Sequence, residues 1–294
     1  MVDSMRAPSK VGGVPVPEVS VVVPTRDRPE GLARCLAALE RQSGGGLEVV
    51  VVDDGSRDPE PVAAAVAGTP LATYLRLGGQ GPAAARNAGV QVARGTIVCF
   101  TDDDCEPAAG WISALAAAIE TGAPAAAGPT VLPDRCDPFA RATQLIVDHL
   151  VERSRGSLGD VGFAPTSNLA CRTDVLREIP FDEGFPSFGE DRDWCARLRE
   201  AGHRLAWVPG AVVVHHQWLD LATFVGKHAR YGRGAWRFRR SNPAYGRLEP
   251  PGFYVSLLGR AAGRGAGTAA AVCLAQAATA AGVLREAVAR DRAS

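Results

Sequence analysis

Short apolar runs alternate with helical patterns through the first hundred residues of the chain. Four runs are typical of strands buried on both faces, at residues 19–23, 47–52, 72–77 and 96–101. Between the first two runs, apolar side chains recur at helical spacing at Leu32, Cys35, Leu36 and Leu39. Strands that alternate with helices predict a mostly parallel sheet with helices on both faces. Ligands bind such sheets outside the carboxyl ends of the strands, so we expect the loops after these runs to meet at one crevice.

The pattern after residue 108 is less regular. It predicts helices near 111–119, 139–151 and 190–198, and short strands near 125–131, 168–172, 205–208 and 212–216. Residues 156–166 form a glycine-bearing loop that we expect to order when a substrate binds. Residues 219–240 are basic and amphipathic. Residues 265–284 carry no charge, but alanine dominates them, which favours a packed or interfacial helix over a bilayer span.

Composition narrows the class of protein. The chain has 294 residues with 32 basic and 32 acidic side chains, so its formal net charge is zero and binding to nucleic acid is not indicated. None of the seven cysteines forms a CxxC pair, which favours buried thiols in a reducing compartment over a zinc knuckle or a disulfide framework. Residues 1–18 are polar and rich in proline and glycine. They predict a flexible leader without a secretory signal, and we expect a cytoplasmic protein.

The fourth apolar run ends in three consecutive aspartates, Asp102, Asp103 and Asp104, with Glu106 close behind. Like charges at this spacing raise one another's pKa and disfavour the folded state. A hard divalent cation such as Mg²⁺ or Mn²⁺ would relieve the repulsion, because it prefers oxygen ligands and keeps positions open for phosphates. An acidic surface turn that leads into the next helix is the alternative.

Two other strand-end loops carry residues suited to a nucleotide. Asp54 can accept hydrogen bonds from a base edge or a ribose, although Asp-Gly is also a common turn sequence. Arg86 follows a glycine loop at the start of a predicted helix, where a guanidinium and backbone N–H groups suit a diphosphate. A surface arginine is the alternative there. The sequence has no Walker A motif and no GxGxxG after the first strand, which argues against a P-loop enzyme and a dinucleotide-dependent dehydrogenase.

Five stretches carry a resemblance to a known family: VSVVVPTRDRPEGLARCL, VVVVDDGSRD, GPAAARNAGV, FTDDDCEP and FGEDRDWCARLREAG. In this order they resemble the motifs of the family 2 glycosyltransferases with the GT-A fold, over about residues 19–216. The resemblance implies a Rossmann-like α/β fold with a mostly parallel central sheet and a C-terminal helical extension. It also implies transfer of a sugar from a nucleotide-diphosphate donor, with inversion at the anomeric carbon and with Mn²⁺ or Mg²⁺ as cofactor.

The resemblance assigns donor-binding roles to residues of the first four stretches. Those that it implies for the nucleotide-sugar are Pro24, Thr25, Asp27, Asp54, Arg86, Asn87, Asp102 and Asp103. Asp102 and Asp104 match the ends of the DXD motif, which holds the divalent ion and the donor. Asp103 stands where the family often has a small residue.

The last stretch and the residues near it receive the remaining roles by resemblance. Asp191 matches the catalytic base, with Glu190 beside it in the ED motif; the alternative is that Asp191 only caps a helix and Glu190 lies next to it on the surface. His215 matches a histidine near the metal, and His216 is its rival. Asn168 and Trp194 are expected on the acceptor side.

The expected organisation has three parts. Residues 1–18 are the leader, and residues 19–218 are the GT-A domain, with a nucleotide-sugar half over about 19–108 and an acceptor half over about 109–218. Residues 219–294 are the helical extension. Its basic stretch suggests an anionic acceptor or peripheral contact with the inner face of the membrane, and a solvated helix face is the alternative.

The predicted function is thus an inverting glycosyltransferase that uses a UDP-, GDP- or dTDP-linked sugar and an acceptor hydroxyl whose identity the sequence leaves open. A nucleotidyltransferase would share an acidic metal site, but VVVPTRDR lacks the glycines expected near its first strand. A non-catalytic nucleotide-sugar-binding module is the third reading. The presence of both the DXD and the ED elements argues against it.

Overall fold

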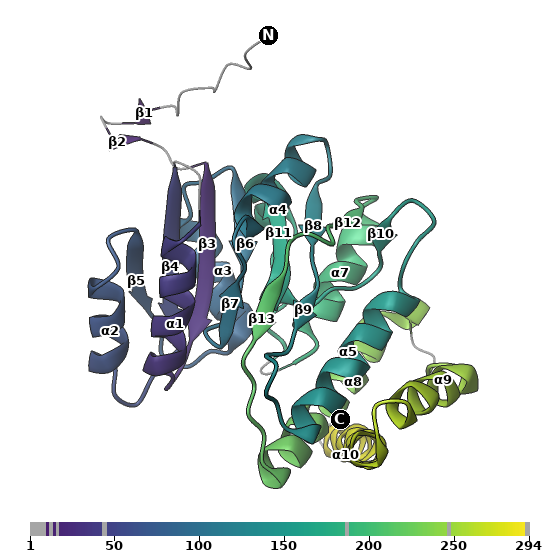
Figure 1. Cartoon of the computed structure of the whole chain (residues 1–294). Coiled ribbons are helices and arrows are strands. Elements are labelled where there is room, and N and C mark those ends of the chain that lie inside the picture. The colour runs from purple at the N-terminus through teal and green to yellow at the C-terminus, as the bar shows by residue number, and fades with distance from the viewer. Residues whose placement is uncertain are drawn as a thin grey trace.

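The computed structural model describes residues 10–11, 14–15, 18–42, 46–185, 188–245 and 248–291 (Figure 1). The leader expected at 1–18 lies largely outside the described residues. Within it, β1 (Lys10–Val11) and β2 (Val14–Pro15) pair antiparallel.

The centre of the molecule is an eight-stranded sheet in the order β10-β12-β8-β11-β6-β3-β4-β5. Its strands are β3 (Val19–Thr25), β4 (Leu47–Asp53), β5 (Ala72–Arg76), β6 (Ile97–Phe100), β8 (Ala125–Ala127), β10 (Asp160–Val161), β11 (Leu169–Arg172) and β12 (Leu205–Trp207). Within this sheet, β3, β4, β5 and β6 pair in parallel, as their alternation with helices predicts. Strand β11 runs antiparallel between β6 and β8. The predicted α/β fold with a mostly parallel core is confirmed.

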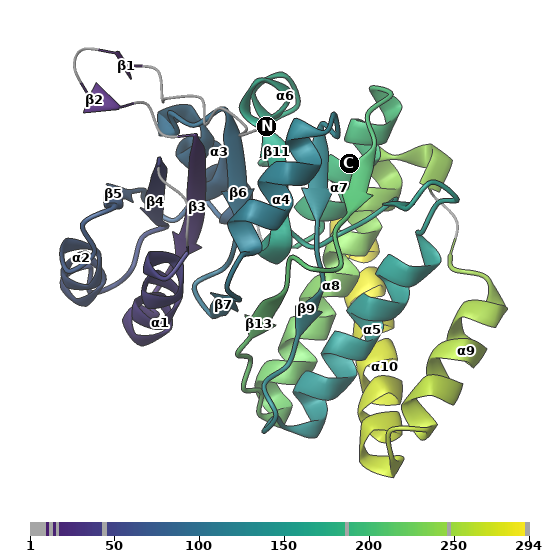
Figure 2. The same ribbon diagram turned by 45° about the horizontal axis from the view of Figure 1, so that its top comes forward.

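Helices cover both faces of this sheet (Figure 2). One face packs against α1 (Pro29–Glu40), α2 (Glu60–Ala67) and α4 (Trp111–Glu120), and the other against α3 (Pro82–Val92), α6 (Thr173–Glu178) and α7 (Glu190–Glu200). Successive valines of β3 alternate between the two cores, with Val21 and Val23 on the first face and Val22 on the second. Because both faces are buried, the strand is almost continuously apolar.

A second, three-stranded sheet has the order β7-β13-β9. It consists of β7 (Cys105–Pro107), β9 (Thr130–Val131) and β13 (Val213–His215). The single strand expected at 125–131 is divided between the two sheets. The break falls at Gly128, where a Cβ would collide with the carbonyl oxygen of Ala211. The loop expected at 156–166 includes the edge strand β10, which pairs with β12.

The remaining helices form a layer beside the sheets, with a hydrophobic core of its own (Figure 2). They are α5 (Pro138–Arg153), α8 (Leu221–Ser241), α9 (Pro251–Ala262) and α10 (Ala266–Asp291), with the short turns η1 (Thr166–Asn168) and η2 (Pro243–Tyr245) elsewhere in the chain. By length and composition, one helix of the described residues, at Ala266–Ala289, is apolar enough to cross a membrane, and a third of its most apolar window is buried inside the molecule.

Helices α8 and α10 approach each other closely. A Cβ at Gly232 would collide with the backbone of Thr279, and one at Gly282 with the backbone of Ala229. The buried carboxylate of Glu286 on α10 accepts from Arg233 and Arg237 on α8, at 2.8 Å each. The two helices are therefore joined by both backbone proximity and charge.

Replacement of Gly232 by Ala should destabilise the protein by about 1–3 kcal/mol, because the added methyl group has to push α10 away from α8. Gly226→Ala in the same helix is the matched control. Its Cβ would meet only a flexible arginine end at 3.8 Å, so a gain of about 0.5–1 kcal/mol in helix stability is expected. Denaturant unfolding of both variants measures the difference, and equal stabilities would contradict the packing described.

Candidate active site

The acidic run Asp102–Asp104 lies between the end of β6 and the start of β7, where the two sheets meet. Its middle carboxylate points inward. Asp103 is buried, accepts a hydrogen bond from Thr25 Oγ1 at 2.8 Å and lies 3.1 Å from Arg28 Nη1. Burial raises the pKa of Asp103 to about 6, although Arg28 opposes the shift. Asp103 and Thr25 thus tie the acidic run to the loop after β3.

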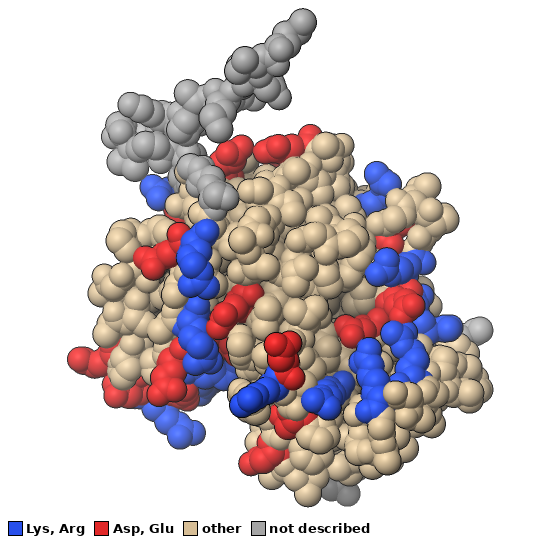
Figure 3. All heavy atoms as spheres, in the orientation of Figure 1, with Lys and Arg blue, Asp and Glu red and all other residues tan. Residues whose placement is uncertain are grey.

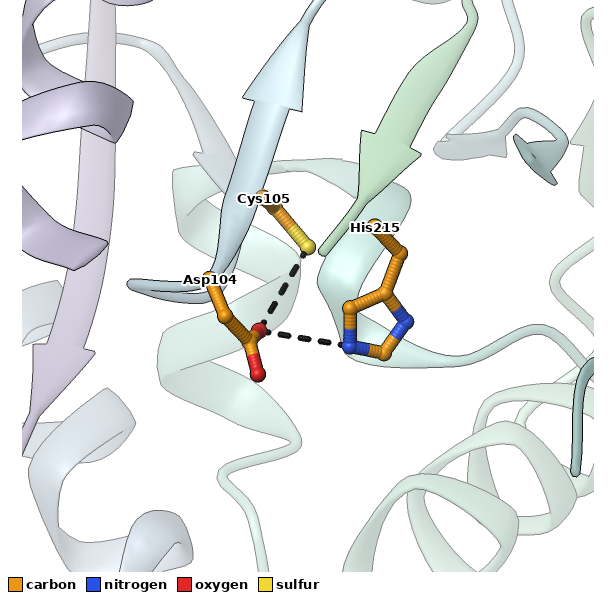
Figure 4. A group of neighbouring side chains, drawn as sticks. All are labelled: Asp104, Cys105 and His215. Atoms are coloured by element: carbon orange, nitrogen blue, oxygen red, sulfur yellow. Dashed lines mark hydrogen bonds and ion pairs between the residues drawn. The ribbon is translucent and has the colours of Figure 1, made fainter. Parts of the chain in front are cut away.

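Asp104 faces the small sheet, together with His215 and Cys105 (Figure 4). Because His215 on β13 pairs with Cys105 on β7, its Nε2 lies 3.2 Å from Asp104 Oδ1. Burial alone would raise the pKa of Asp104, but the hydrogen bond from His215 and the charge of Arg28 hold it well below its usual value. His216 lies 3.2 Å from Glu106 instead, so His215 is the histidine that faces the acidic run.

These side chains suit a divalent ion. One ligand atom from each of Asp104, Cys105 and His215 lies within 4.8 Å of the others. The Cys105 thiol is a soft ligand, which hard cations such as Mn²⁺ and Mg²⁺ bind less readily than oxygen or imidazole nitrogen. Asp104 and His215 therefore remain as an oxygen and nitrogen pair of the kind that binds Mn²⁺.

Asp102 faces the other way, toward Arg86 at the start of α3. The buried Arg86 guanidinium lies 3.0 Å from Asp102 Oδ1 and 2.9 Å from Glu190 Oε1. This double ion pair brings the first turn of α7, and with it Asp191, to the acidic run. Arg86 Nε and Glu190 Oε2 are both buried without a hydrogen-bond partner among the described residues.

The two carboxylates at the start of α7 are shifted toward their protonated forms. Burial and the neighbouring Asp191 raise the pKa of Glu190 to about 7, against the effect of Arg86. Burial also raises the pKa of Asp191, whose Oδ1 accepts a hydrogen bond from the backbone N–H of Arg192 at 2.8 Å. A carboxylate with a raised pKa is a stronger base once it is ionised.

The strand-end loops form a connected rim. Both oxygens of the buried Asp54 accept backbone hydrogen bonds, from Gln80 at 2.7 Å and from Gly81 at 2.8 Å, and so close the glycine loop before α3. Asp27 has a left-handed backbone with φ of 55°, and its carboxylate accepts from the N–H of Arg57 at 2.8 Å. Pro24 is half-buried in β3, one residue before Thr25. The loops after β3, β4 and β5 are thus bonded to one another.

Three of the expected site residues have other partners. The amide of Asn87 donates to Phe181 O and Glu183 Oε1, and its oxygen accepts from Phe181 N–H, so it holds the loop at 181–183. Asn168 and Trp194 are fully buried. We therefore correct the expectation that these two line the acceptor side, because neither side chain reaches a surface.

The partners of Asn168 and Trp194 explain their burial. Asn168 accepts from Trp111 Nε1 at 2.8 Å and donates to Pro129 O and Ala211 O, which joins the two sheets. Trp194 Nε1 donates to Ile179 O at 2.8 Å, and its ring stacks on Phe181.

Sequence reasoning missed three residues beside the acidic run. Arg28 lies in the TRDR loop and contacts both Asp103 and Asp104. Lys227 and Tyr231 come from α8, and the charges of Asp102 and Asp104 act on the pKa of both. Their spacing of four residues puts them on one face of the helix, which was the available signal.

Comparison with known proteins gives the family. Residues 20–179 match the model of the glycosyl transferase family 2, which covers more than half of the chain. The chain belongs to this family.

Individual relatives agree with this assignment. The chain is 34% identical over 225 residues to a pre-mycofactocin glycosyltransferase of Mycobacterium tuberculosis, over 74% of this chain and 47% of that protein. It is 29% identical over 234 residues to the glycosyltransferase AglE of Haloferax volcanii, over 74% of this chain and 73% of that protein. The chain thus spans about half the length of the first of these relatives.

A solved structure supports the fold. The mannosyltransferase PcManGT from Pyrobaculum calidifontis, in complex with GDP-Man and Mn²⁺, superposes with a TM-score of 0.60 at 22% identity, over 89% of this chain and 74% of that chain. At this identity the likeness concerns the fold, and it agrees with the GT-A architecture expected from the sequence.

The raised pKa of Glu190 predicts a pH-dependent stability. Because the folded-state pKa of about 7 exceeds the usual value of 4.5, Glu190 favours the folded state below pH 4.5, and this contribution is lost as the pH rises toward 7. Glu190→Gln should start from a lower stability, because Arg86 loses a charged partner, but its free energy of unfolding relative to wild type should rise by on the order of 2 kcal/mol as the pH increases from 4.5 to 7.

Denaturant unfolding in EDTA at several pH values measures this change. Glu200→Gln, at the exposed end of α7, is the control. Its free energy of unfolding should change with pH in parallel with that of wild type. A parallel curve for Glu190→Gln as well would refute the raised pKa.

Proposed function

We propose that the protein is a metal-dependent, inverting glycosyltransferase that moves a sugar from a nucleotide-diphosphate donor to an acceptor hydroxyl. One observation carries the proposal: Arg86 bridges Asp102 and Glu190, so the acidic run and the start of α7 share a single site. Family membership supports the reaction class. The complex of PcManGT with GDP-Man and Mn²⁺ supports the donor and cofactor classes.

In this proposal Asp104 and His215 hold the divalent ion, and Asp102 borders it. A bound Mn²⁺ or Mg²⁺ would supply positive charge to the diphosphate as it leaves. The chain supplies further positive charge through Arg86 and Arg28, which already lie beside these carboxylates. Charge placed where the leaving group develops is more effective than uniform binding of the substrate.

Asp191 is the proposed base. Its carboxylate takes the proton of the acceptor hydroxyl while that oxygen bonds to the anomeric carbon and the bond to the diphosphate oxygen breaks. One displacement from the face opposite the leaving group inverts the configuration. Glu190 positions this turn of α7 through Arg86 and does not itself need to exchange a proton.

The nucleoside is proposed to bind over the rim made by the loops after β3, β4 and β5. Pro24, Thr25 and Asp27 contribute from the first loop and Asp54 from the second. Because the oxygens of Asp54 already bind the backbone of the glycine loop, its main contribution is the shape of that loop. Which of UDP, GDP or dTDP fits the rim is decided by a thermal-shift comparison of the three with Mn²⁺.

The acceptor is proposed to approach along α7. Arg192, next to the proposed base, lines a hollow of about 200 Å³ together with Arg153, Phe163 and Glu249. Basic side chains at its border favour an acceptor that carries an acidic group. On the face seen in Figure 3, basic and acidic side chains are interspersed, which argues against binding of a nucleic acid there.

The domain division and location remain proposals. Residues 19–218 are proposed to form the glycosyltransferase domain and residues 219–294 the helical extension, although α5 shares the core of that helical layer. Five of the seven free cysteines are buried, which supports a reducing, cytoplasmic compartment. Exposed Val255 and Leu258 on α9, near Arg260 and Arg264, support peripheral contact with an anionic membrane.

Asp191→Asn should lower kcat by about 10²- to 10⁴-fold, because the amide cannot accept the acceptor's proton. Donor affinity, measured by calorimetry with a nucleoside diphosphate and Mn²⁺, should stay within about twofold of wild type. Glu200→Gln on the same helix is the control and should retain full activity. Loss of donor affinity in Asp191→Asn would place Asp191 on the donor and not on the acceptor.

Chelation with EDTA should abolish transfer, and added Mn²⁺ or Mg²⁺ should restore it. Asp104→Asn should weaken Mn²⁺ binding by roughly 10- to 100-fold, since it removes a charged ligand. Electron paramagnetic resonance of free Mn²⁺ gives the affinity directly, and Glu120→Gln at the exposed end of α4 is the control. Activity that survives chelation would refute the metal dependence.

A further inference from the structure

Lys227 on α8 is a half-buried cation with a neutral partner. Its ammonium donates to Gln217 Oε1 at 2.9 Å, and no carboxylate of the described residues lies within ion-pair distance of it. Burial lowers its pKa, while Asp104 and Asp102 act in the opposite direction. An ammonium held out of water without a counter-ion is costly unless an anion joins it.

Contacts along the chain place Lys227 at the metal side of the candidate site. Its partner Gln217 follows His215 by two residues, and its backbone N–H donates to His215 O at 3.2 Å. His215 in turn contacts Asp104. The ammonium is therefore linked to the proposed metal pair through a single short segment.

A second set of contacts connects Lys227 to the side of the site that holds the proposed base. Its ammonium lies 5.9 Å from the centre of the Tyr231 ring, and that ring packs edge-on against Phe188 at 4.5 Å. Phe188 precedes Gly189 and Glu190, where α7 begins. Lys227 and Tyr231 thus lie between the Asp104–His215 pair and the start of α7.

The helix that carries them is held rigidly against this site. A Cβ at Gly234 would collide with the carbonyl oxygen of Phe188, so the backbone of α8 lies directly on the segment before α7. Lys227, Tyr231 and Gly234 are spaced by four and three residues and share one helix face. Lys227 is thus positioned by packing, unlike a surface lysine that moves freely.

We propose that Lys227 binds the diphosphate of the nucleotide-sugar donor and that Tyr231 holds it in position. This inference rests on the proposed function. Both residues lie outside the segment 20–179 that matches the family model, so α8 would complete the donor site from the C-terminal part of the chain. Arg28 and Arg86 each lie within ion-pair distance of two carboxylates, whereas no carboxylate of the described residues lies that close to Lys227, so its charge is the most available for the leaving group.

The test compares nucleoside diphosphates with monophosphates. Calorimetry in Mn²⁺ measures the affinity of whichever of UDP, GDP or dTDP binds wild type most tightly, and of its monophosphate. Lys227→Met should weaken binding of the diphosphate by about 10- to 100-fold, the usual effect of one charge-assisted hydrogen bond, and leave the monophosphate within about threefold. Lys227→Arg should recover part of the loss.

Two controls separate this role from others. Arg240→Met removes a charge from the far, exposed end of the same helix and should leave both affinities unchanged. Binding of Mn²⁺ alone to Lys227→Met, followed by electron paramagnetic resonance, should be equal to or tighter than in wild type, because a repelling cation is gone. Circular dichroism verifies that the variants are folded.

The outcomes are distinct. Wild type that binds none of the three diphosphates would refute the proposed function itself. Wild-type affinity for the diphosphate in Lys227→Met would overturn only the role of Lys227. Equal loss of diphosphate and monophosphate binding, or a parallel loss of Mn²⁺ binding, would also overturn it, since Lys227 would then act on the shape of the site or on the metal.

Discussion

The candidate site depends on one buried cation. Arg86 is 5% exposed and is held between Asp102 and Glu190 at 3.0 and 2.9 Å. A guanidinium in this position is stable only while both carboxylates stay in place, because a buried charge that loses a partner is strongly destabilising. The double ion pair thus fixes the distance between the acidic run and the first turn of α7. A reaction that uses both the acidic run and the first turn of α7 therefore depends on Arg86 for the distance between them.

The three aspartates of the acidic run have different roles, because one side chain is buried and the other two face the site. Asp103 is buried and tied to Thr25, whereas Asp102 and Asp104 turn to Arg86 and to His215. Asp103 and Asp104 lie in a turn that the Cys105 N–H closes by donating to Asp102 O at 3.1 Å, so the three side chains point in different directions and the middle one need not face the ligand. An aspartate at this position, where the family often has a small residue, therefore serves the loop after β3 and leaves the outer two for the donor and the metal.

The sequence predicts the strands of the parallel core well because burial on both faces leaves a nearly unbroken apolar run. It also predicts the convergence of the loops, because parallel strands end at one edge of the sheet. The sequence does not predict which polar side chains turn inward. Asn168 and Trp194 look available along the chain, yet both serve the junctions between elements that are distant in sequence.

The contribution of α8 escapes sequence analysis for a related physical reason. Its basic residues look alike in a linear pattern, but they divide among several environments. Arg233 and Arg237 bind Glu286, Arg240 lies exposed over Trp236, and Lys227 faces the acidic run. The packing of Gly234 against Phe188, together with that of Gly232 against Thr279, determines which face of the helix points inward. These contacts depend on tertiary structure and leave no periodic signal.

The ion pairs of Glu286 on α10 with Arg233 and Arg237 on α8 make the last helix a support for the candidate site, although α10 is far from that site in sequence. No described side chain of α10 contacts the acidic run, yet this helix packs against the side of α8 opposite Lys227 and Tyr231. A polypeptide that ended before α10 would retain every proposed site residue. It would lose the helix that holds α8, and with it Lys227 and Tyr231, in position. We would expect such a polypeptide to be impaired because α8 is less firmly held against the site, and not because a functional group is missing.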